Sequence, residues 1–223
     1  MVATMARTSR FVAPGHPHHV TQRGNQRNRV FFGDDDYRLY LSILTEQARV
    51  GGCEVWCYCL MPNHVHLILR PDSEAALART VGETHRRYTT LINGRNKTTG
   101  YLWQGRFWSA ALDERYLLDA ARYVLNNPVD GNKIKHPTAW PWSSARAHAS
   151  SKSDGVVAVE PLAQRIGPFE QFMRTEVDPG AKERHETAVR RGWPIGDKTF
   201  IADLETMLGR KAEPRERGRP RQS

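Results

Sequence analysis

Residues 53–69 of this chain read CEVWCYCLMPNHVHLIL, and this stretch predicts the centre of the fold. Two apolar runs, at 53–60 and 64–69, are separated by the residues Met-Pro-Asn at 61–63. Short apolar runs divided by turn-forming residues are typical of two antiparallel strands joined in a hairpin. We therefore expect a β-hairpin here, with the other elements arranged around it.

Patterns on both sides of the hairpin predict two further strands and three helices. Apolar residues at helical spacing, N-capping aspartates and closing Gly or Pro residues mark the helices. We expect strands at 19–23 and within 102–112, and helices at 35–50, at 74–92 and at 114–127, the last stopped by Pro128. This order matches the split β-α-β, or ferredoxin-like, arrangement, in which one antiparallel sheet is backed by helices and its first and third strands lie side by side at the centre. The predicted fold class is α+β.

The pattern weakens after Pro128, which predicts a helical or irregular C-terminal extension. We expect the WPWSS sequence at 140–144 to pack on the core as an irregular segment, and residues 150–185 to form loops and short helices. An amphipathic helix is predicted at 199–208. The expected domains are a core domain over 10–146, a partly helical extension over 147–209 and a tail over 210–223.

The tail at 210–223 is basic and poor in apolar residues, so we expect it to be disordered when free. It holds six Lys and Arg residues against two Glu, a net charge of 6 − 2 = +4. Its RGRP sequence resembles an AT-hook core, which would lay Arg217 and Arg219 into the narrow minor groove of A·T-rich duplex DNA. The alternative is a solvated basic tail without base preference.

The composition indicates a protein that binds an acidic partner, with nucleic acid first and an anionic membrane surface second. The formal net charge is +9. No apolar run approaches the roughly 20 residues of a membrane helix. All three cysteines lie within 53–59, which argues against a disulfide framework and favours a reducing, cytoplasmic compartment, near the nucleoid if the partner is DNA.

The second strand of the hairpin carries a His-x-His pair. Residues two apart on a strand point to the same face, so His64 and His66 project together while Val65 points away. Two neighbouring imidazoles suit one divalent metal ion. The alternative is an ordinary pair of surface or core histidines.

A second set of polar residues lies on the helix that is expected to end at Pro128. Tyr123 and Asn127 are four residues apart and share a helix face. Among the seven tyrosines, only Tyr123 is followed at this spacing by a side chain that can bind a metal. The tyrosine is thus a candidate nucleophile and Asn127 a candidate metal ligand. In the alternative, Tyr123 packs in the core and Asn127 caps the helix.

Cations and aromatic side chains interleave around residues 103–108, a pattern that can stack bases and grip a single strand. At least half of these aromatic residues are expected to pack in the core instead. The residues that we assign to DNA binding are Arg23, Arg86, Arg87, Arg106, Arg217 and Arg219.

Five short motifs together resemble one known family. They are PHHVTQRGN at 17–25, PNHVHLI at 62–68, LWQGRF at 102–107, YVLNNPV at 123–129 and WPWSS at 140–144. In order and spacing they resemble the HUH single-tyrosine transposases, and within them the REP-associated tyrosine transposases. The resemblance covers about residues 10–146.

This resemblance implies an HUH nuclease domain that cuts and rejoins single-stranded or hairpin DNA of REP-like repeats. It implies that His64 and His66 bind Mg²⁺ or Mn²⁺, that Asn127 completes the metal site and that Tyr123 is the nucleophile. Many relatives in the wider class have glutamine at the place of Asn127. The implied products are a 5′-phosphotyrosine and a free 3′-OH. The alternative function is a non-catalytic DNA-binding protein that retains the fold, and the sequence gives no oligomeric state.

Overall fold

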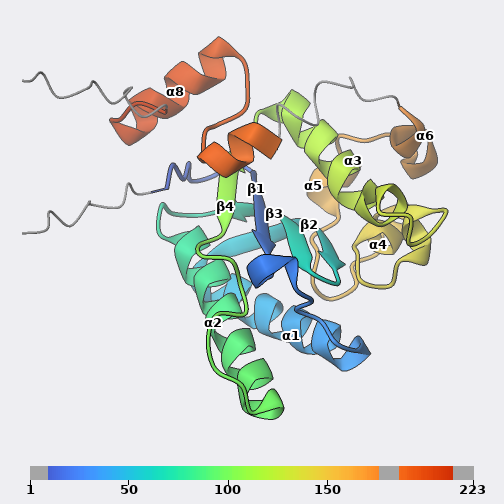
Figure 1. Cartoon of the computed structure of the whole chain (residues 1–223). Helices are drawn as coiled ribbons and strands as arrows, with labels where there is room; N and C mark the ends of the chain where they lie inside the picture. The colour runs from blue at the N-terminus through green and yellow to red at the C-terminus, as the bar shows by residue number, and fades with distance from the viewer. Residues whose placement is uncertain (1–9, 176–185, 213–223) are drawn as a thin grey trace, which may run out of the picture.

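The computed structural model describes residues 10–175 and 186–212, and these form one antiparallel sheet with helices on both faces (Figure 1). The strand order is β2-β3-β1-β4. The strands are β1 (His18–Arg23), β2 (Cys53–Met61), β3 (His64–Pro71) and β4 (Trp108–Ala111). The longest helices are α1 (Asp34–Gly51), α2 (Ala76–Asn96) and α3 (Glu114–Asp130). The predicted ferredoxin-like α+β fold and the β2–β3 hairpin are confirmed.

The first and third strands, β1 and β3, lie side by side at the centre of the sheet, as predicted. Their antiparallel register pairs Thr21 with His66 and Arg23 with His64. On its other side β1 pairs with β4, so that Thr21 also lies opposite Trp108. The register therefore brings the polar end of β1 next to the two histidines of β3.

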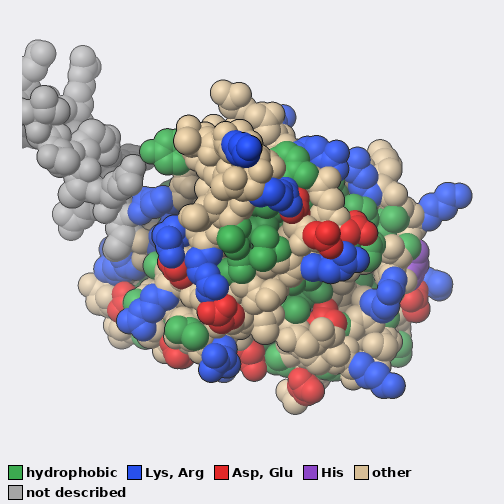
Figure 2. Space-filling view, turned by 90° about the horizontal axis from the view of Figure 1, so that it is seen from below, with side chains coloured by type: hydrophobic (Ala, Val, Ile, Leu, Met, Phe, Trp, Pro, Cys, Tyr) green, Lys and Arg blue, Asp and Glu red, His purple; other side chains and the backbone are tan. Residues whose placement is uncertain are grey.

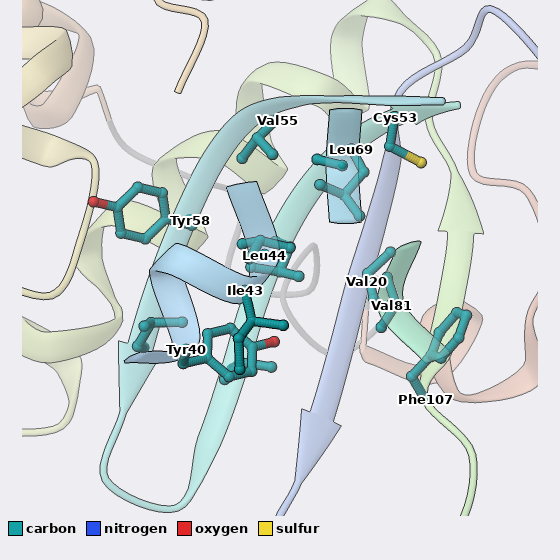
Figure 3. Close-up of a cluster of buried hydrophobic side chains, with 14 of the residues drawn as sticks. Val20, Tyr40, Ile43, Leu44, Cys53, Val55, Tyr58, Leu69, Val81 and Phe107 are labelled. Carbon is teal, nitrogen blue, oxygen red and sulfur yellow. The ribbon is translucent and has the colours of Figure 1, made fainter. Parts of the chain in front are cut away.

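Two hydrophobic cores lie on opposite faces of the sheet. On one face, Val20 and Leu69 of the sheet pack with Leu44 of α1 and Val81 of α2 (Figure 3). On the other face, Ile68 of β3 and buried residues of α3 belong to a second cluster. Because neighbouring strand residues alternate between faces, Val65 joins the α1–α2 core while His66 faces α3.

The turn after α1 depends on a glycine at its end. Gly52 has φ of 79°, in the left-handed region that favours glycine. A Cβ atom at this position would lie 2.2 Å from the Asp72 carboxylate, so a larger residue would meet both strain and a clash.

The last turn of α2 extends beyond the predicted end at residue 92 and reaches Asn96. Asn93, Gly94 and Asn96 are weak helix formers, but the Arg95 guanidinium donates to both carboxylate oxygens of Asp36, at the start of α1. A third hydrogen bond, from the Phe32 N–H at 2.7 Å, holds the same carboxylate. This tertiary contact offsets the weak local propensity.

The prediction that Pro128 stops α3 was wrong, because the helix continues through it to Asp130. A proline here removes the N–H that would bond to the Val124 carbonyl, and its ring crowds that carbonyl, so other contacts must keep the last turn helical. The end of the helix is held by hydrogen bonds from Gly131 N–H to the Asn127 carbonyl and from Lys133 N–H to the Pro128 carbonyl. Pro128 is also buried, so packing favours it there.

Main chain from later in the sequence lies along the outer strand β2 and meets the other outer strand, β4, at its end. The WPWSS segment follows β2, where Leu60 N–H donates to the Trp142 carbonyl at 2.8 Å and Ser144 N–H donates to the Tyr58 carbonyl at 3.0 Å. At the other edge, Ile195 N–H donates to the Ala111 carbonyl at the end of β4. The WPWSS segment thus packs on the core, as predicted.

The described part of the extension consists of short helices and loops, in agreement with the weak sequence pattern, while residues 176–185 of the segment expected at 150–185 lie outside the described residues. The helices are α4 (Ala145–Ser150), α5 (Glu160–Ala163), α6 (Phe169–Arg174), a helical stretch at 186–191 and α8 (Lys198–Leu208). The predicted amphipathic helix at 199–208 corresponds to α8, which packs with Phe11 and Ala13 through Leu204. In the described part of the chain, no helix has the length and apolar character needed to cross a membrane.

The first residues of the predicted tail are packed rather than free. Arg210 lies over the Phe11 ring, with its guanidinium carbon 5.2 Å from the ring centroid, and Ala212 is buried. The rest of the tail, including Arg217 and Arg219, lies outside the described residues.

Candidate active site

The four residues predicted to carry the chemistry lie together on the α3 side of the sheet. His64 and His66 come from β3, and Tyr123 and Asn127 come from α3. The His64 Nε2 atom lies 3.1 Å from Asn127 Oδ1. The His66 ring centroid lies 5.0 Å from that of His64 and 5.2 Å from that of Tyr123. Two elements far apart in sequence thus bring together two imidazoles, an amide oxygen and a phenol.

The orientation of the His64 ring follows from Asn63. The Asn63 Nδ2 group donates to the Arg27 carbonyl at 3.0 Å, so Asn63 Oδ1 must face His64 Nδ1, at 2.7 Å. An amide oxygen only accepts, so Nδ1 carries the proton of the neutral ring and Nε2 has a lone pair. Burial lowers the pKa of His64 to about 4, which keeps this ring neutral. The Nε2 lone pair therefore faces the Asn127 oxygen, and two acceptors directed at one point are an arrangement that a cation between them would stabilise.

His66 is held in a similar way by a third histidine. His19 of β1 is buried, and its Nε2 atom lies 2.9 Å from His66 Nδ1. The two rings stack with their centroids 5.1 Å apart. A contact to Nδ1 fixes the ring and leaves Nε2 as the metal-binding nitrogen, as is usual for histidine ligands. In the sequence, His19 stands out only as a member of the PHHVTQRGN motif, and Asn63 only as a member of the PNHVHLI motif.

Tyr123 contacts a carboxylate from the C-terminal extension. Its hydroxyl donates to Glu186 Oε1 at 3.3 Å. Burial raises the pKa of Tyr123 well above its ordinary value, and the negative charge of Glu186 and this hydrogen bond act in the same direction. Sequence reasoning missed Glu186, because it lies 63 residues from Tyr123 in a segment with no recognisable motif.

A cavity of about 310 Å³ opens beside Tyr123 and His66. Three arginines line it against a single carboxylate, so its charge favours an anion such as a phosphodiester. Its lining residues are His19, Thr21, Arg23, Gln26, Arg27, His66, Gln104, Trp108, Tyr123, Glu186, Val189 and Arg190.

The loop at one side of this cavity has an unfavourable backbone conformation. Gln26 and Arg27, in the short helix η1 (Asn25–Arg27), have φ angles of 53° and 62°. Left-handed conformations at two successive residues other than glycine cost free energy, and they tend to cluster at functional sites. Here they place both residues at the cavity and the Arg27 carbonyl against Asn63.

The structure brings only some of the predicted DNA-binding residues to this cavity. Arg23 lines it, and Arg106 is exposed in the loop before β4. Arg86 and Arg87 lie on α2, in the opposite helical layer, where they form ion pairs with Glu83 and Glu46. Figure 2 views the molecule from the side where α1 and α2 lie, and Lys and Arg side chains there are interspersed with Asp and Glu.

The aromatic residues near β4 divide between the core and the cavity. Trp103 and Phe107 are buried in the α1–α2 core, while Gln104 and Trp108 line the cavity. The expectation that at least half of these aromatic residues would pack in the core agrees with their positions.

Within the described ranges, no group of three or more His, Cys, Asp or Glu side chains could hold a metal ion. The candidate metal site has two histidines, and its third donor is an amide, so it is not a group of three such side chains.

An antiparallel ferredoxin-like sheet with a histidine pair facing a tyrosine-bearing helix defines the HUH class of DNA-processing domains.

Comparison with known proteins gives the family. The family model described as "Transposase IS200 like" matches residues 14–127. The chain therefore belongs to the IS200-like transposase family, whose members act on DNA. A comparison with curated protein sequences gave no match.

One solved structure shares this fold, and a second is similar over part of the chain. The structure of a REP-associated tyrosine transposase bound to a REP hairpin superposes with a TM-score of 0.56 at 21% identity, covering 69% of this chain and 92% of that one. A candidate transposase from Deinococcus radiodurans R1 gives a TM-score of 0.39 at 21% identity, covering 54% of this chain and 96% of that one. The first superposition shows that the fold is shared.

Proposed function

We propose that this transposase is a metal-dependent single-stranded DNA endonuclease and strand transferase with Tyr123 as its nucleophile. The Tyr123 oxygen would attack a phosphodiester, form a 5′-phosphotyrosine and release a 3′-OH. Attack by a 3′-OH on the phosphotyrosine would reverse the reaction and join strands, so no ATP is needed. The observation that carries this proposal is the convergence of His64, His66, Asn127 and Tyr123 beside one cavity.

The donor set fits a divalent metal ion. Neutral imidazole nitrogens of His64 and His66 and the Asn127 amide oxygen would hold it, and this mixture of donors suits Mn²⁺ better than Mg²⁺. When bound, such an ion would neutralise charge on the scissile phosphate. Asn63 and His19 would then orient the two imidazoles.

We propose single-stranded or hairpin DNA from repeats as the substrate. The arginines that line the cavity, Arg23, Arg27 and Arg190, are suited to the backbone of a nucleic acid. The REP hairpin bound to the structural relative supports a hairpin as the first DNA to test. Arg106, exposed near the cavity, is a further candidate contact, and Arg217 and Arg219 are candidates for A·T-rich duplex.

We also propose that the division into a catalytic domain over 10–146, an extension over 147–209 and a basic tail after it has a functional meaning. The extension contributes to the site, since Glu186, Val189 and Arg190 line the cavity. Arg210 and Ala212, at the start of the tail over 210–223, contact the folded part of the chain.

The test is covalent capture of DNA. The protein is incubated with end-labelled single-stranded hairpins from its own genome and Mn²⁺, and adducts are resolved on a denaturing gel. We expect an SDS-resistant adduct that excess EDTA prevents and that Tyr123→Phe abolishes while DNA binding persists. Tyr116→Phe, on the same helix, is the matched control and should still form the adduct. An adduct formed by the Tyr123→Phe protein, or one that is indifferent to EDTA, would contradict the proposal.

A further inference from the structure

The helical stretch at 186–191 is attached to the sheet beside Tyr123. Val189 is buried in the core that includes α3. Just beyond the stretch, Ile195 N–H donates to the Ala111 carbonyl at 2.8 Å and Asp113 N–H donates to the Ile195 carbonyl at 3.0 Å. This stretch lies near the end of β4 (Figure 1), and these contacts fix the position of Glu186.

Each carboxylate oxygen of Glu186 has a different partner. Oε1 accepts the hydrogen bond from the Tyr123 hydroxyl at 3.3 Å, and Oε2 lies 3.5 Å from Arg190 Nη2. Arg190 lies one helical turn after Glu186 in the same stretch, and its ion pair with Glu186 orients the carboxylate. Oε1 is thereby directed at the oxygen that must lose its proton.

We infer that Glu186 is the general base that accepts the proton of the Tyr123 hydroxyl. The inference rests on the proposed function, in which Tyr123 is the nucleophile. An ordinary phenol is protonated at neutral pH, so the nucleophile needs an acceptor within hydrogen-bond reach. The observed distance of 3.3 Å is slightly long, as is common before substrate binds.

The proposed step is balanced in both directions. In cleavage, the phenol O–H bond breaks and an O–H bond forms on Glu186 Oε1. The phenolate oxygen forms a bond to phosphorus, the bond from phosphorus to the 3′ oxygen breaks, and that oxygen takes a proton from water. In joining, a 3′-OH gives its proton to water and its oxygen forms a bond to phosphorus, the bond from phosphorus to the Tyr123 oxygen breaks, and Glu186 returns a proton to the phenolate. The Glu186 side chain is 39% exposed, so it can exchange protons with water between the two steps.

Two other roles for Glu186 make different predictions. A carboxylate that only holds Tyr123 away from DNA would slow the enzyme, so its removal would speed adduct formation. A carboxylate that binds the metal ion would support Mn²⁺ affinity, so its removal would weaken that affinity together with the rate.

The experiment measures single-turnover adduct formation by the full-length protein with hairpin DNA and saturating Mn²⁺. Glu186→Gln keeps the size of the side chain but cannot act as a base. Glu186→Ala removes the carboxylate and leaves space in which a small carboxylate such as formate can take its place. We expect both variants to be slower by about 10²–10⁴-fold, with unchanged Mn²⁺ affinity and thermal stability. Added formate should restore part of the rate of Glu186→Ala but not of Glu186→Gln. Glu170→Ala removes another glutamate of the extension, paired with His136, and should leave the rate unchanged.

The outcomes separate this inference from the function on which it rests. An adduct in the wild type that Tyr123→Phe abolishes keeps the proposed function, whatever Glu186 does. A Glu186→Gln rate equal to or above that of the wild type overturns the inference. A rate loss that follows a loss of Mn²⁺ affinity, or that formate does not restore in Glu186→Ala, also overturns it.

Discussion

The Nε2 atom of His19 lies 2.9 Å from the Nδ1 atom of His66, so a buried residue of β1 holds the imidazole that β3 turns toward α3. If His66 binds the metal ion through Nε2, this contact keeps its ring in the binding orientation.

Replacing His19 should therefore weaken metal binding through His66. We expect His19→Ala to lower Mn²⁺ affinity and the rate of adduct formation by about 10–100-fold, and His19→Gln to lose less, because a side-chain amide can still meet Nδ1. Calorimetric Mn²⁺ titration measures the affinity, and thermal unfolding checks the fold. His136→Ala, at an exposed histidine paired with Glu170, is the control. Wild-type Mn²⁺ affinity in a folded His19→Ala protein would rule out this positioning role.

Replacing Asn127 should change the affinity for Mn²⁺ and leave the nucleophile Tyr123 in place. Its Oδ1 atom faces the lone pair of His64 Nε2 at 3.1 Å. We expect Asn127→Ala to raise the Mn²⁺ concentration needed for half-maximal cleavage by about tenfold or more, and Asn127→Asp to lower it, because a carboxylate adds a negative charge. A Mn²⁺ titration of the cleavage rate provides the measurement. The same half-saturating concentration in all three proteins would remove Asn127 from the metal site.

The contact between Asp36 and Arg95 should contribute to stability at neutral pH. Burial raises the pKa of Asp36, but the hydrogen bonds from Arg95 and from the Phe32 and Gly33 main chain outweigh it and leave the pKa lowered. Asp36→Asn should lower the free energy of unfolding by about 1–3 kcal/mol, toward the lower end because water screens the half-exposed Arg95. Asp35→Asn, at a carboxylate that is 94% exposed, should change stability by less than about 0.5 kcal/mol.

The same ion pair predicts a pH dependence with a defined sign. A carboxylate whose pKa is lowered by folding stabilises the protein above its ordinary pKa, about 3.9, and loses this effect as pH falls through the lowered value. The stability difference between the wild type and Asp36→Asn should thus be constant from about pH 5 to 7 and shrink below about pH 4. Denaturant unfolding across this range measures it. A difference that grows on acidification would contradict the assignment.

Removing residues 213–223 should weaken DNA binding and flatten its salt dependence without changing the cleavage rate at saturating DNA. This segment holds four arginines against two glutamates, so it carries 4 − 2 = +2. Each lost phosphate contact should reduce the slope of log K against log salt by roughly 0.7 for single strands or 0.9 for duplex. Fluorescence anisotropy at several salt concentrations measures the slope.

Two matched double variants then separate minor-groove reading from bulk charge. Arg217→Ala with Arg219→Ala alters the RGRP sequence, whereas Arg215→Ala with Arg221→Ala removes the same charge beside it. If RGRP reads the minor groove, only the first pair should lose affinity selectively for A·T-rich duplex over G·C-rich duplex. Equal losses for both pairs on all DNAs would leave a nonspecific basic segment.

The parts of this structure that the sequence predicts are those with local causes. The two apolar runs in 53–69, separated by Met-Pro-Asn, predict the β2–β3 hairpin, and strand geometry alone puts His64 and His66 on one face. The shared helix face of Tyr123 and Asn127 likewise needs only their spacing. These predictions succeed because each depends on residues that are close together in the chain.

The features that the sequence did not predict depend on contacts between distant residues. The last turn of α2 forms because Arg95 meets Asp36, 59 residues away. The orientation of His66 depends on the pairing of β1 with β3, which brings His19 to it across 47 residues. Glu186 reaches Tyr123 only because Val189 and Ile195 dock on the core. No local pattern encodes these three contacts.

The main chain at Ile195 has a consequence for how this protein behaves at high concentration. An uncovered outer strand exposes unpaired N–H and C=O groups on which a second chain can add a strand and begin to aggregate. Here Ile195 bonds beside the end of β4, while the WPWSS segment protects β2. A chain cut after residue 146 would keep the WPWSS segment beside β2 and lose Ile195 at the end of β4. We therefore expect the extension to limit strand addition at the end of β4, and a shortened catalytic domain to need dilute solution to stay soluble.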